Sequence, residues 1–161
     1  MKCTTREACV KRYGPIDFAS RHWPGQNKWM VMVEIDHSKY PNWFVGGTKQ
    51  PVTHIYCNLD MRDPLLNALH SVDVKGLSGL LHTYDGAFNI RMVRGSNDHF
   101  SAHSYGLAID LNASENPLGS IKGGFYDHPD FIKCFTDAGF ASGAHFHGRR
   151  DSMHYSYCFE G

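Results

Sequence analysis

The chain has 161 residues, enough for one domain of ordinary size whose core needs no disulfide or metal to hold it together. Hydrophobic residues make up 42% and charged residues 20%, which is typical of a globular protein and excludes a disordered one. Lysine plus arginine equals aspartate plus glutamate at 16 each, so the zero formal charge argues against nucleic acid or an anionic membrane as a partner. We therefore expect one monomeric domain over residues 1–161, with no membrane insertion.

Cysteine usage and the N-terminus limit the setting in which the chain works. Five cysteines are an odd number and form no C-x-x-C pair, which argues against a disulfide framework and a cysteine-rich zinc knuckle. We expect these thiols to be buried or idle. No apolar segment follows Met1–Glu7, so we expect no signal peptide, and no apolar run is long enough for a membrane span. The protein is then made in a cytoplasm, and action outside it needs a route supplied by another component.

The first half of the chain predicts three strands and a helix. We expect residues 1–25 to be irregular, because Gly14-Pro15 and Pro24-Gly25 interrupt them. Runs of β-branched and aromatic residues predict strands over 29–35, 43–45 and 52–57. Asp63-Pro64 is typical of a helix start. An apolar face then follows at spacings of four and three: Leu65, Leu69 and Val72.

The second half predicts further helices and strands. We expect a second helical stretch around 77–81 and strands over 88–93 and 107–111. Residues 129–138 predict a helix with Phe131 and Phe135 inward and Gly139 as its stop. The tail, 154–158, alternates like a final strand. The mixture predicts an α+β fold with a small antiparallel sheet and flanking helices.

The segment Ser101–Asp110, S-A-H-S-Y-G-L-A-I-D, contains the first candidate metal ligands. His103 and Asp110 are seven positions apart, about 23 Å on a strand or about 10 Å on a helix. Metal ligands lie only about 2 Å from the ion, so the two can share a metal only if the chain bends between them. Residues 104–106 can supply that bend through Gly106. In the strand that follows, Asp110 shares a face with the small Ala108 and points away from the apolar side.

The segment D-S-M-H, Asp151–His154, supplies the remaining groups. His154 is the candidate third ligand, and three protein ligands with one open position are the catalytic form of a zinc site. Asp151 is a carboxylate that need not bind the metal and could move a proton from water to the leaving amine. Arg91 and Arg94 are candidates for stabilising the oxyanion that forms when a peptide carbonyl is attacked.

With these residues in place, the chain resembles a known family. The pattern S-x-H-x-x-G-x-A-x-D followed by acid-x-x-H looks like the zinc D-alanyl-D-alanine dipeptidases and carboxypeptidases. That family includes the L-alanyl-D-glutamate endopeptidases of phage endolysins and shares its fold with the hedgehog signalling domain. The similarity runs from about Gly86 to Tyr157. Its motifs are G-A-F-N-I-R (86–91), Gly95, S-A-H-S-Y-G-L-A-I-D-L-N (101–112), Asn116-Pro117, Gly139-Phe140 and D-S-M-H (151–154).

The resemblance implies roles for individual residues. It implies a hedgehog-like peptidase fold and one Zn²⁺ per chain, held by His103, Asp110 and His154. Asp151 then corresponds to the general base. Arg91 matches the family arginine better than Arg94, because it follows the G-x-aromatic-N-x-R pattern. Residues 1–60 match nothing in the family and are taken as an extension of the same domain.

Two departures from the family and several alternative roles remain open. Ser142-Gly143-Ala144 stands where endolysin-like members carry Trp-Gly-Gly, and Ser156 where Glu or Gln is usual. Asp151 could instead orient a histidine, and Arg91 could be a structural ion-pair partner. His145 and His147 form an H-x-H pair that would share a strand face and could bind metal.

The resemblance also implies a substrate, the peptide stem of peptidoglycan. Endolysin-like members tend to carry Asp in acid-x-x-H, as Asp151 does, whereas dipeptidases tend to carry Glu. We therefore predict a phage endolysin that is made in a bacterial host and cuts the L-Ala–D-Glu bond of the cell wall. The alternatives are a D-Ala–D-Ala carboxypeptidase or dipeptidase, a non-catalytic zinc-binding module, and a structural protein of the phage particle.

Overall fold

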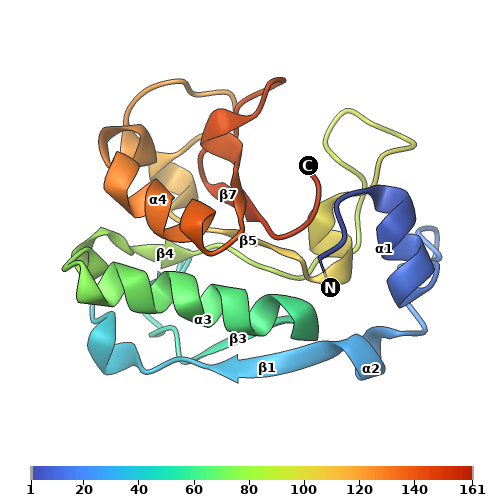
Figure 1. The fold of residues 1–161 in the computed structure, drawn as a ribbon, viewed down its shortest axis with the longest axis horizontal. Helices are drawn as coiled ribbons and strands as arrows, with labels where there is room; N and C mark the ends of the chain where they lie inside the picture. The colour runs from blue at the N-terminus through green and yellow to red at the C-terminus, as the bar shows by residue number, and fades with distance from the viewer. Residues whose placement is uncertain (1, 161) are drawn as a thin grey trace.

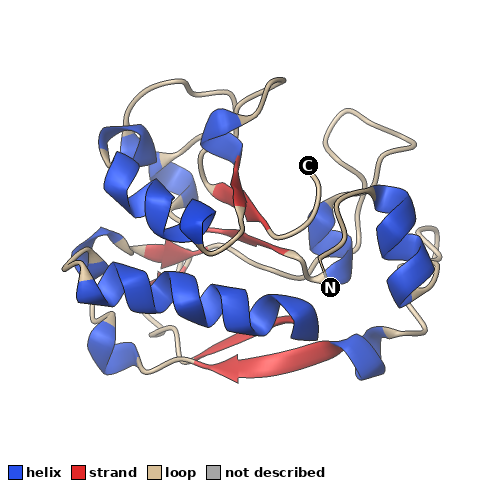
Figure 2. Cartoon of the chain, viewed as in Figure 1, coloured by secondary structure: helices blue, strands red, loops and turns tan. Residues whose placement is uncertain are grey.

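The computed structural model describes residues 2–160. They form helices and short strands (Figures 1 and 2). The helices are α1 (Arg6–Tyr13), α2 (Gln26–Trp29), α3 (Leu59–Val74) and α4 (Pro129–Asp137). The strands are β1 (Met30–Glu34), β2 (Phe44–Val45), β3 (His54–Asn58), β4 (Thr83–Tyr84), β5 (Ala108–Asp110), β6 (Ala141–Ser142) and β7 (His154–Ser156). Among the short 3-10 turns, η3 (Ala102–Tyr105) and η6 (Gly143–His145) help to form the site described below. The predicted α+β class is confirmed.

Within residues 2–160, the strands form three small sheets rather than the one we predicted. β1 pairs with β3, and β5, β7 and β6 form a three-stranded sheet in that order, both antiparallel. β2 and β4 pair in parallel. In the three-stranded sheet Asp110 of β5 lies opposite His154 of β7. Because opposite residues of neighbouring strands place their side chains together, this register brings two predicted site residues into contact.

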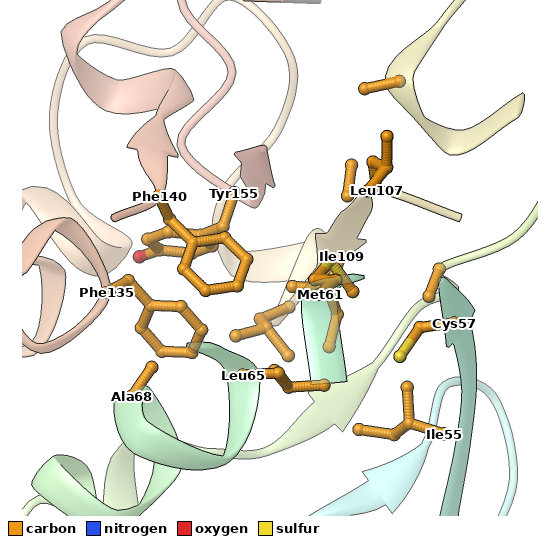
Figure 3. Close-up of a cluster of buried hydrophobic side chains, with 14 of the residues drawn as sticks. Ile55, Cys57, Met61, Leu65, Ala68, Leu107, Ile109, Phe135, Phe140 and Tyr155 are labelled. Atoms are coloured by element: carbon orange, nitrogen blue, oxygen red, sulfur yellow. The ribbon is translucent and has the colours of Figure 1, made fainter. Parts of the chain in front are cut away.

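Helix α3 crosses the middle of the molecule and joins its layers (Figure 1). It contacts β1 and β3 on one side and α4 on the other. Burial of this apolar surface, worth about 25 cal/mol per Å², holds the three-stranded sheet to the rest of the chain. The side chains labelled in Figure 3 are buried in one continuous hydrophobic cluster: Ile55, Cys57, Met61, Leu65, Ala68, Leu107, Ile109, Phe135, Phe140 and Tyr155.

Helix α3 begins a full turn earlier than Asp63-Pro64, where we predicted its start. The Asn58 side-chain oxygen accepts a hydrogen bond from the Asp60 N–H at 2.9 Å and caps the helix at Leu59. Pro64 therefore lies inside the helix. Within residues 2–160, no helix is both long enough and apolar enough to cross a bilayer. The predicted apolar face is buried, extended by the earlier start: Met61, Leu65, Ala68, Leu69 and Val72.

Helix α1 lies in a region that we predicted to be irregular. Thr5 caps it, because its hydroxyl accepts a hydrogen bond from the Ala8 N–H at 3.1 Å. Only Cys9 and Tyr13 of this helix are buried, so its apolar face is too narrow to stand out in the sequence. The predicted breaker Gly14 does end it.

The second helical stretch that we predicted around 77–81 is present only as a short 3-10 helix, Ser78–Leu80. Gly76 ends α3 with a positive φ of 70°, and the Leu77 N–H returns to the Val72 carbonyl oxygen at 2.9 Å. Strand β4 begins at Thr83. The segment between them has room only for the single 3-10 turn Ser78–Leu80.

The predicted strand over 88–93 is wrong for a different reason. Its backbone bonds to the turn that carries His103 instead of to a strand: the Asn89 N–H donates to the His103 carbonyl oxygen at 3.0 Å. The Arg91 N–H donates to the Ser104 hydroxyl oxygen at 3.1 Å, and Ser104 returns a bond to the Arg91 carbonyl oxygen at 2.8 Å. This pairing fastens the Arg91 segment to the predicted metal site.

The predictions for the C-terminal half agree more closely with the structure. α4 covers 129–137 with Phe131 and Phe135 buried, and Gly139 follows it with a positive φ of 101°. β5 and β7 each occupy the centre or start of a predicted strand but contain only three residues. The strong periodicity of α4 explains why this element was predictable.

Candidate metal centre

Two neighbouring strands hold the first pair of site residues. Asp110 ends β5, His154 begins β7, and the His154 Nδ1 lies 3.0 Å from the Asp110 Oδ1. The histidine is buried, and 17% of the Asp110 side chain is exposed. Strand pairing therefore sets this geometry through the backbone, without the help of a loop.

His103 reaches the same carboxylate because the chain bends sharply after it. His103 lies in η3, which Ser101 caps through a 3.3 Å bond from the His103 N–H. Gly106 ends the turn in the left-handed conformation, at φ 67° and ψ 28°. The His103 Nε2 then lies 3.2 Å from the Asp110 Oδ1. One ligand atom from each of His103, Asp110 and His154 lies within 4.8 Å of the others, so this group could hold a metal ion.

The polar atoms of this group fit a cation. The His103 Nδ1 lies 3.0 Å from the Ala87 carbonyl oxygen, which can only accept, so Nδ1 carries the proton and Nε2 presents a lone pair. Within residues 2–160, the Nε2 atoms of both His103 and His154 are buried without a hydrogen-bond partner. The 3.2 Å contact between the His103 Nε2 and the Asp110 carboxylate is favourable when a positive charge lies between them, and either a proton on Nε2 or a bound cation supplies that charge. Two imidazoles and a carboxylate are a donor set that catalytic zinc uses.

The charges within the group are strongly linked. Burial opposes ionisation of Asp110, but the neighbouring His103 and His154 hold the pKa of its carboxyl well below the usual range. Burial alone would lower the pKa of His103, yet the Asp110 carboxylate raises it above its ordinary value. Asp110 thus stays ionised and available to a cation.

Gly106 is required both for its conformation and for its lack of a side chain. A Cβ there would lie 2.7 Å from the Met30 Cε and 3.0 Å from the Asn58 nitrogen. We expect Gly106→Ala to lower the free energy of unfolding by about 2 kcal/mol or more, because left-handed backbone and overpacking each carry a cost. Urea denaturation measures this. Gly79→Ala, at a site with open space, is the control and should change stability by less than about 0.5 kcal/mol. Equal midpoints for both variants would contradict the expectation.

Asp151 lies in the turn that leads into β7, beside the metal group. Its N–H donates to the Gly143 carbonyl oxygen at 3.0 Å, and its carbonyl oxygen accepts from the His154 N–H at 3.0 Å. Within residues 2–160, its Oδ1 atom is buried without a hydrogen-bond partner. Burial raises the pKa of this carboxyl, and Asp110 adds to the effect, while His154, His103 and Arg94 oppose it. A carboxylate with a raised pKa and an unused oxygen is suited to accept a proton.

Residues 94–157 match the model of a family described as D-alanyl-D-alanine carboxypeptidase. No curated protein and no solved structure matches the chain. The match supports a zinc peptidase that acts on peptidoglycan. The matched stretch contains His103, Asp110, Asp151 and His154, but it begins after Arg91.

A cavity of about 290 Å³ adjoins the metal group. Both arginines that the sequence predicts for the oxyanion, Arg91 and Arg94, line this cavity. Arg91 lies near His103, and its positive charge lowers the pKa of that histidine. Arg94 lies near Asp151, and its charge lowers the pKa of that carboxyl. The cavity is lined by Arg91, Val93, Arg94, Ser101, Asp110, Leu118, Phe146, Gly148, Arg149, Asp151, Met153, His154 and Glu160.

The H-x-H pair does not join this group. His145 ends η6 and residues 146–150 belong to no strand, so the prediction that His145 and His147 share a strand face is wrong. The His147 side chain is 94% exposed and lies 3.6 Å from Glu160. Neither histidine belongs to the metal group found among residues 2–160.

Sequence reasoning missed a buried polar link behind the site. The Asn116 side-chain oxygen accepts hydrogen bonds from the Phe125 N–H at 2.8 Å and from the Ser152 hydroxyl at 3.0 Å. Asn116 thereby ties the D-S-M-H segment to the chain that follows β5. The Asn116-Pro117 pair was part of the family resemblance, but nothing in the sequence identified Ser152 as its partner.

Gly143 controls how closely η6 approaches Asp151. A Cβ at this position would overlap the Asp151 carbonyl oxygen and lie 2.7 Å from its carbonyl carbon. We expect Gly143→Ala to displace Asp151 and lower kcat by about 10-fold or more with zinc still bound, since small misplacements of catalytic groups are costly. Steady-state kinetics and elemental analysis check this, with Gly79→Ala as the control. Unchanged kcat would show that the segment adjusts elsewhere.

Proposed function

We propose that the protein is a zinc-dependent peptidase that cuts the L-Ala–D-Glu bond in the peptide stem of peptidoglycan and acts as a phage endolysin. One observation carries the proposal. Two histidines and a carboxylate converge beside a cavity whose wall holds a second carboxylate, Asp151, with a raised pKa. This arrangement combines a metal site with a proton acceptor, as hydrolysis of a peptide bond requires.

Each residue has a distinct role in this proposal. His103, Asp110 and His154 would hold one zinc ion per chain, which supplies a Lewis acid that polarises a carbonyl and acidifies water. Asp151 accepts a proton from the attacking water and gives it to the leaving amine. Arg91 directs positive charge toward the carbonyl oxygen that becomes negative during attack.

The cavity favours catalysis over a structural zinc module. A structural site has no need of an open space of about 290 Å³ next to its ligands, or of a buried carboxylate oxygen without a partner. Asp151 and the cavity therefore support an enzyme. The same features give no support to a purely structural protein of the phage particle.

Arg91 has a direct test. If it stabilises the developing oxyanion, Arg91→Ala should lower kcat by about 10² or more while zinc stays bound. Among residues 2–160, its Nη1 donates only to the adjacent Met92 carbonyl oxygen, at 3.2 Å, so little structure depends on it. Kinetics of Arg91→Ala and Arg94→Ala, each with its zinc content measured, separate the two. A large loss of kcat in Arg94→Ala alone would move the role to Arg94.

The identity of the bond follows from Asp151 and has one competitor. Asp in the acid-x-x-H motif favours L-Ala–D-Glu cleavage, whereas the family model that matches the chain is described by D-alanyl-D-alanine carboxypeptidase activity. Mass spectrometry and end-group analysis of digested peptidoglycan distinguish the two. New amino-terminal D-Glu supports our proposal, and free D-Ala without it supports the carboxypeptidase. Absence of any cleavage by zinc-loaded protein would contradict both.

We also propose that residues 1–60 complete the same domain, rather than forming a separate wall-binding module. Cys9, Tyr13 and Trp23 are buried in the hydrophobic cluster that includes the core around α3. Lys2 donates to the Gly139 carbonyl oxygen, and the Arg6 guanidinium lies 4.4 Å from the centre of the Phe159 ring. The chain would act on the wall as a single-domain monomer.

A further inference from the structure

Two exposed arginines from separate loops meet at the cavity. Arg94 follows the segment that is fastened to the His103 turn, and Arg149 belongs to the loop before Asp151. The Arg149 Nη2 donates to the Arg94 carbonyl oxygen at 3.2 Å, which holds the Arg149 guanidinium beside the other loop. Arg94 lies close enough to Asp151 to act on its charge. The pair therefore stands beside the proposed proton acceptor.

These guanidinium groups have unused donors. Arg94 and Arg149 form no salt bridge with any carboxylate of residues 2–160. The cavity contains three carboxylates, of which Asp110 is engaged by two histidines and Glu160 lies 3.6 Å from His147. The third is Asp151. Two cations without an ion-pair partner in a substrate cavity favour an anionic ligand.

The two other arginines near the cavity, Arg150 and Arg91, have different roles. Arg150 turns away from the cavity and donates to the Ala144 carbonyl oxygen, and its own carbonyl oxygen accepts from the Gly119 N–H at 2.8 Å. It is thus part of the loop framework. Arg91 lies near His103, where we assign it to the oxyanion. Arg94 and Arg149 are left to recognise the substrate.

We propose that Arg94 and Arg149 form a subsite that binds a carboxylate of the peptide substrate next to the bond that is cut. The inference rests on the proposed function. A guanidinium fork matches the two oxygens of a carboxylate, so one such group can engage both. The substrate offers this chemistry twice: D-Glu keeps a free α-carboxylate when the stem continues through its γ-carboxyl, and the peptide ends in another.

Amidated peptides test the subsite. Three synthetic stem pentapeptides are compared: the free acid, one amidated at the D-Glu α-carboxylate, and one amidated at its C-terminus. We expect wild-type kcat/KM to fall by about 10- to 100-fold for one of the amides, the usual scale for a lost charge-assisted hydrogen bond. The kcat/KM of Arg149→Ala should be lower than that of wild type by a similar factor on the free acid. On the sensitive amide, the variant and wild type should have the same kcat/KM. Arg149 is a cleaner choice than Arg94, whose charge also acts on Asp151.

The control is Arg62→Ala, which removes an exposed arginine of α3 that pairs with Asp63 at 3.1 Å outside the cavity. It should keep the wild-type preference. If wild-type kcat/KM falls on the peptide amidated at the D-Glu α-carboxylate, the subsite binds D-Glu. If it falls on the peptide amidated at its C-terminus, the subsite binds the chain end. Either result supports the inference. Equal slowing of all three peptides by Arg149→Ala, or an acid preference that survives the substitution, overturns it.

Binding separates this inference from the proposed function. If zinc-loaded wild type cuts none of the peptides, the proposed function fails. Calorimetry with the same peptides then still tests the subsite. Tighter binding of the free acid that disappears in Arg149→Ala supports it, and equal affinity for the acid and both amides overturns it.

Discussion

His103→Ala is expected to lose bound zinc and hydrolytic activity together. The substitution removes one of three protein ligands, and the Asp110 and His154 that remain form a two-ligand site that competes poorly for zinc. Elemental analysis of purified protein should fall from about one zinc per chain to near zero. The fold should persist, since among the described residues 2–160 the His103 side chain bonds only to the Ala87 carbonyl oxygen, apart from its contact with Asp110.

His145→Ala is the matched control for this prediction. It removes a histidine that is close in sequence to Asp151 but lies outside the metal group of residues 2–160. We expect full zinc content and near-normal activity. Full zinc content in His103→Ala would show that the metal, if bound, has other ligands. Zinc loss in His145→Ala would revive the H-x-H pair as a metal site.

Asp151→Asn is expected to keep zinc and fold but to lower kcat by about 10² or more. An amide occupies the same space and still accepts hydrogen bonds, but it cannot take a proton from water. The raised pKa of Asp151 also predicts a pH effect. A base must be ionised, so wild-type kcat should fall at acidic pH as Asp151 becomes protonated. The variant should lack this acidic limb.

Measurement of kcat against pH, with zinc content for each protein, tests both parts. Asp137→Asn is the matched control, since Asp137 pairs with Lys133 on the exposed side of α4, outside the cavity. It should keep the wild-type profile. Near-normal turnover in Asp151→Asn would move proton transfer to another group and leave Asp151 as a residue that orients His154.

Elements with a strong local pattern were predictable. Helix α4 and the apolar face of α3 follow from residue spacing, because a helix that packs on one side must repeat its apolar residues every three or four positions. The start of α3 was mispredicted because a proline suggested a boundary that the Asn58 cap overrides. The strand over 88–93 failed because its apolar pattern does not reveal which backbone groups it will pair with.

The residues of the candidate site could be proposed from spacing together with the resemblance to a known family. His103 and Asp110 need a bend between them to share an ion, and Gly106 is the residue that can make it. His154 could be added because an acid-x-x-H motif near the C-terminus supplies a ligand and a carboxylate together. These inferences depend on the order of residue types along the chain, which the sequence states directly.

The surroundings of the site depended on contacts between segments far apart in the chain. Arg149 and Arg150 are adjacent, yet one lines the cavity and the other braces the loop. Ser152 donates a hydrogen bond to Asn116. The Asp151 backbone lies so close to Gly143 that no side chain fits between them. No local pattern encodes these choices, because each is made by the packing of the whole core. The residue types and spacing of the motifs therefore determine which chemical groups the site contains. Tertiary packing determines the direction in which each side chain points.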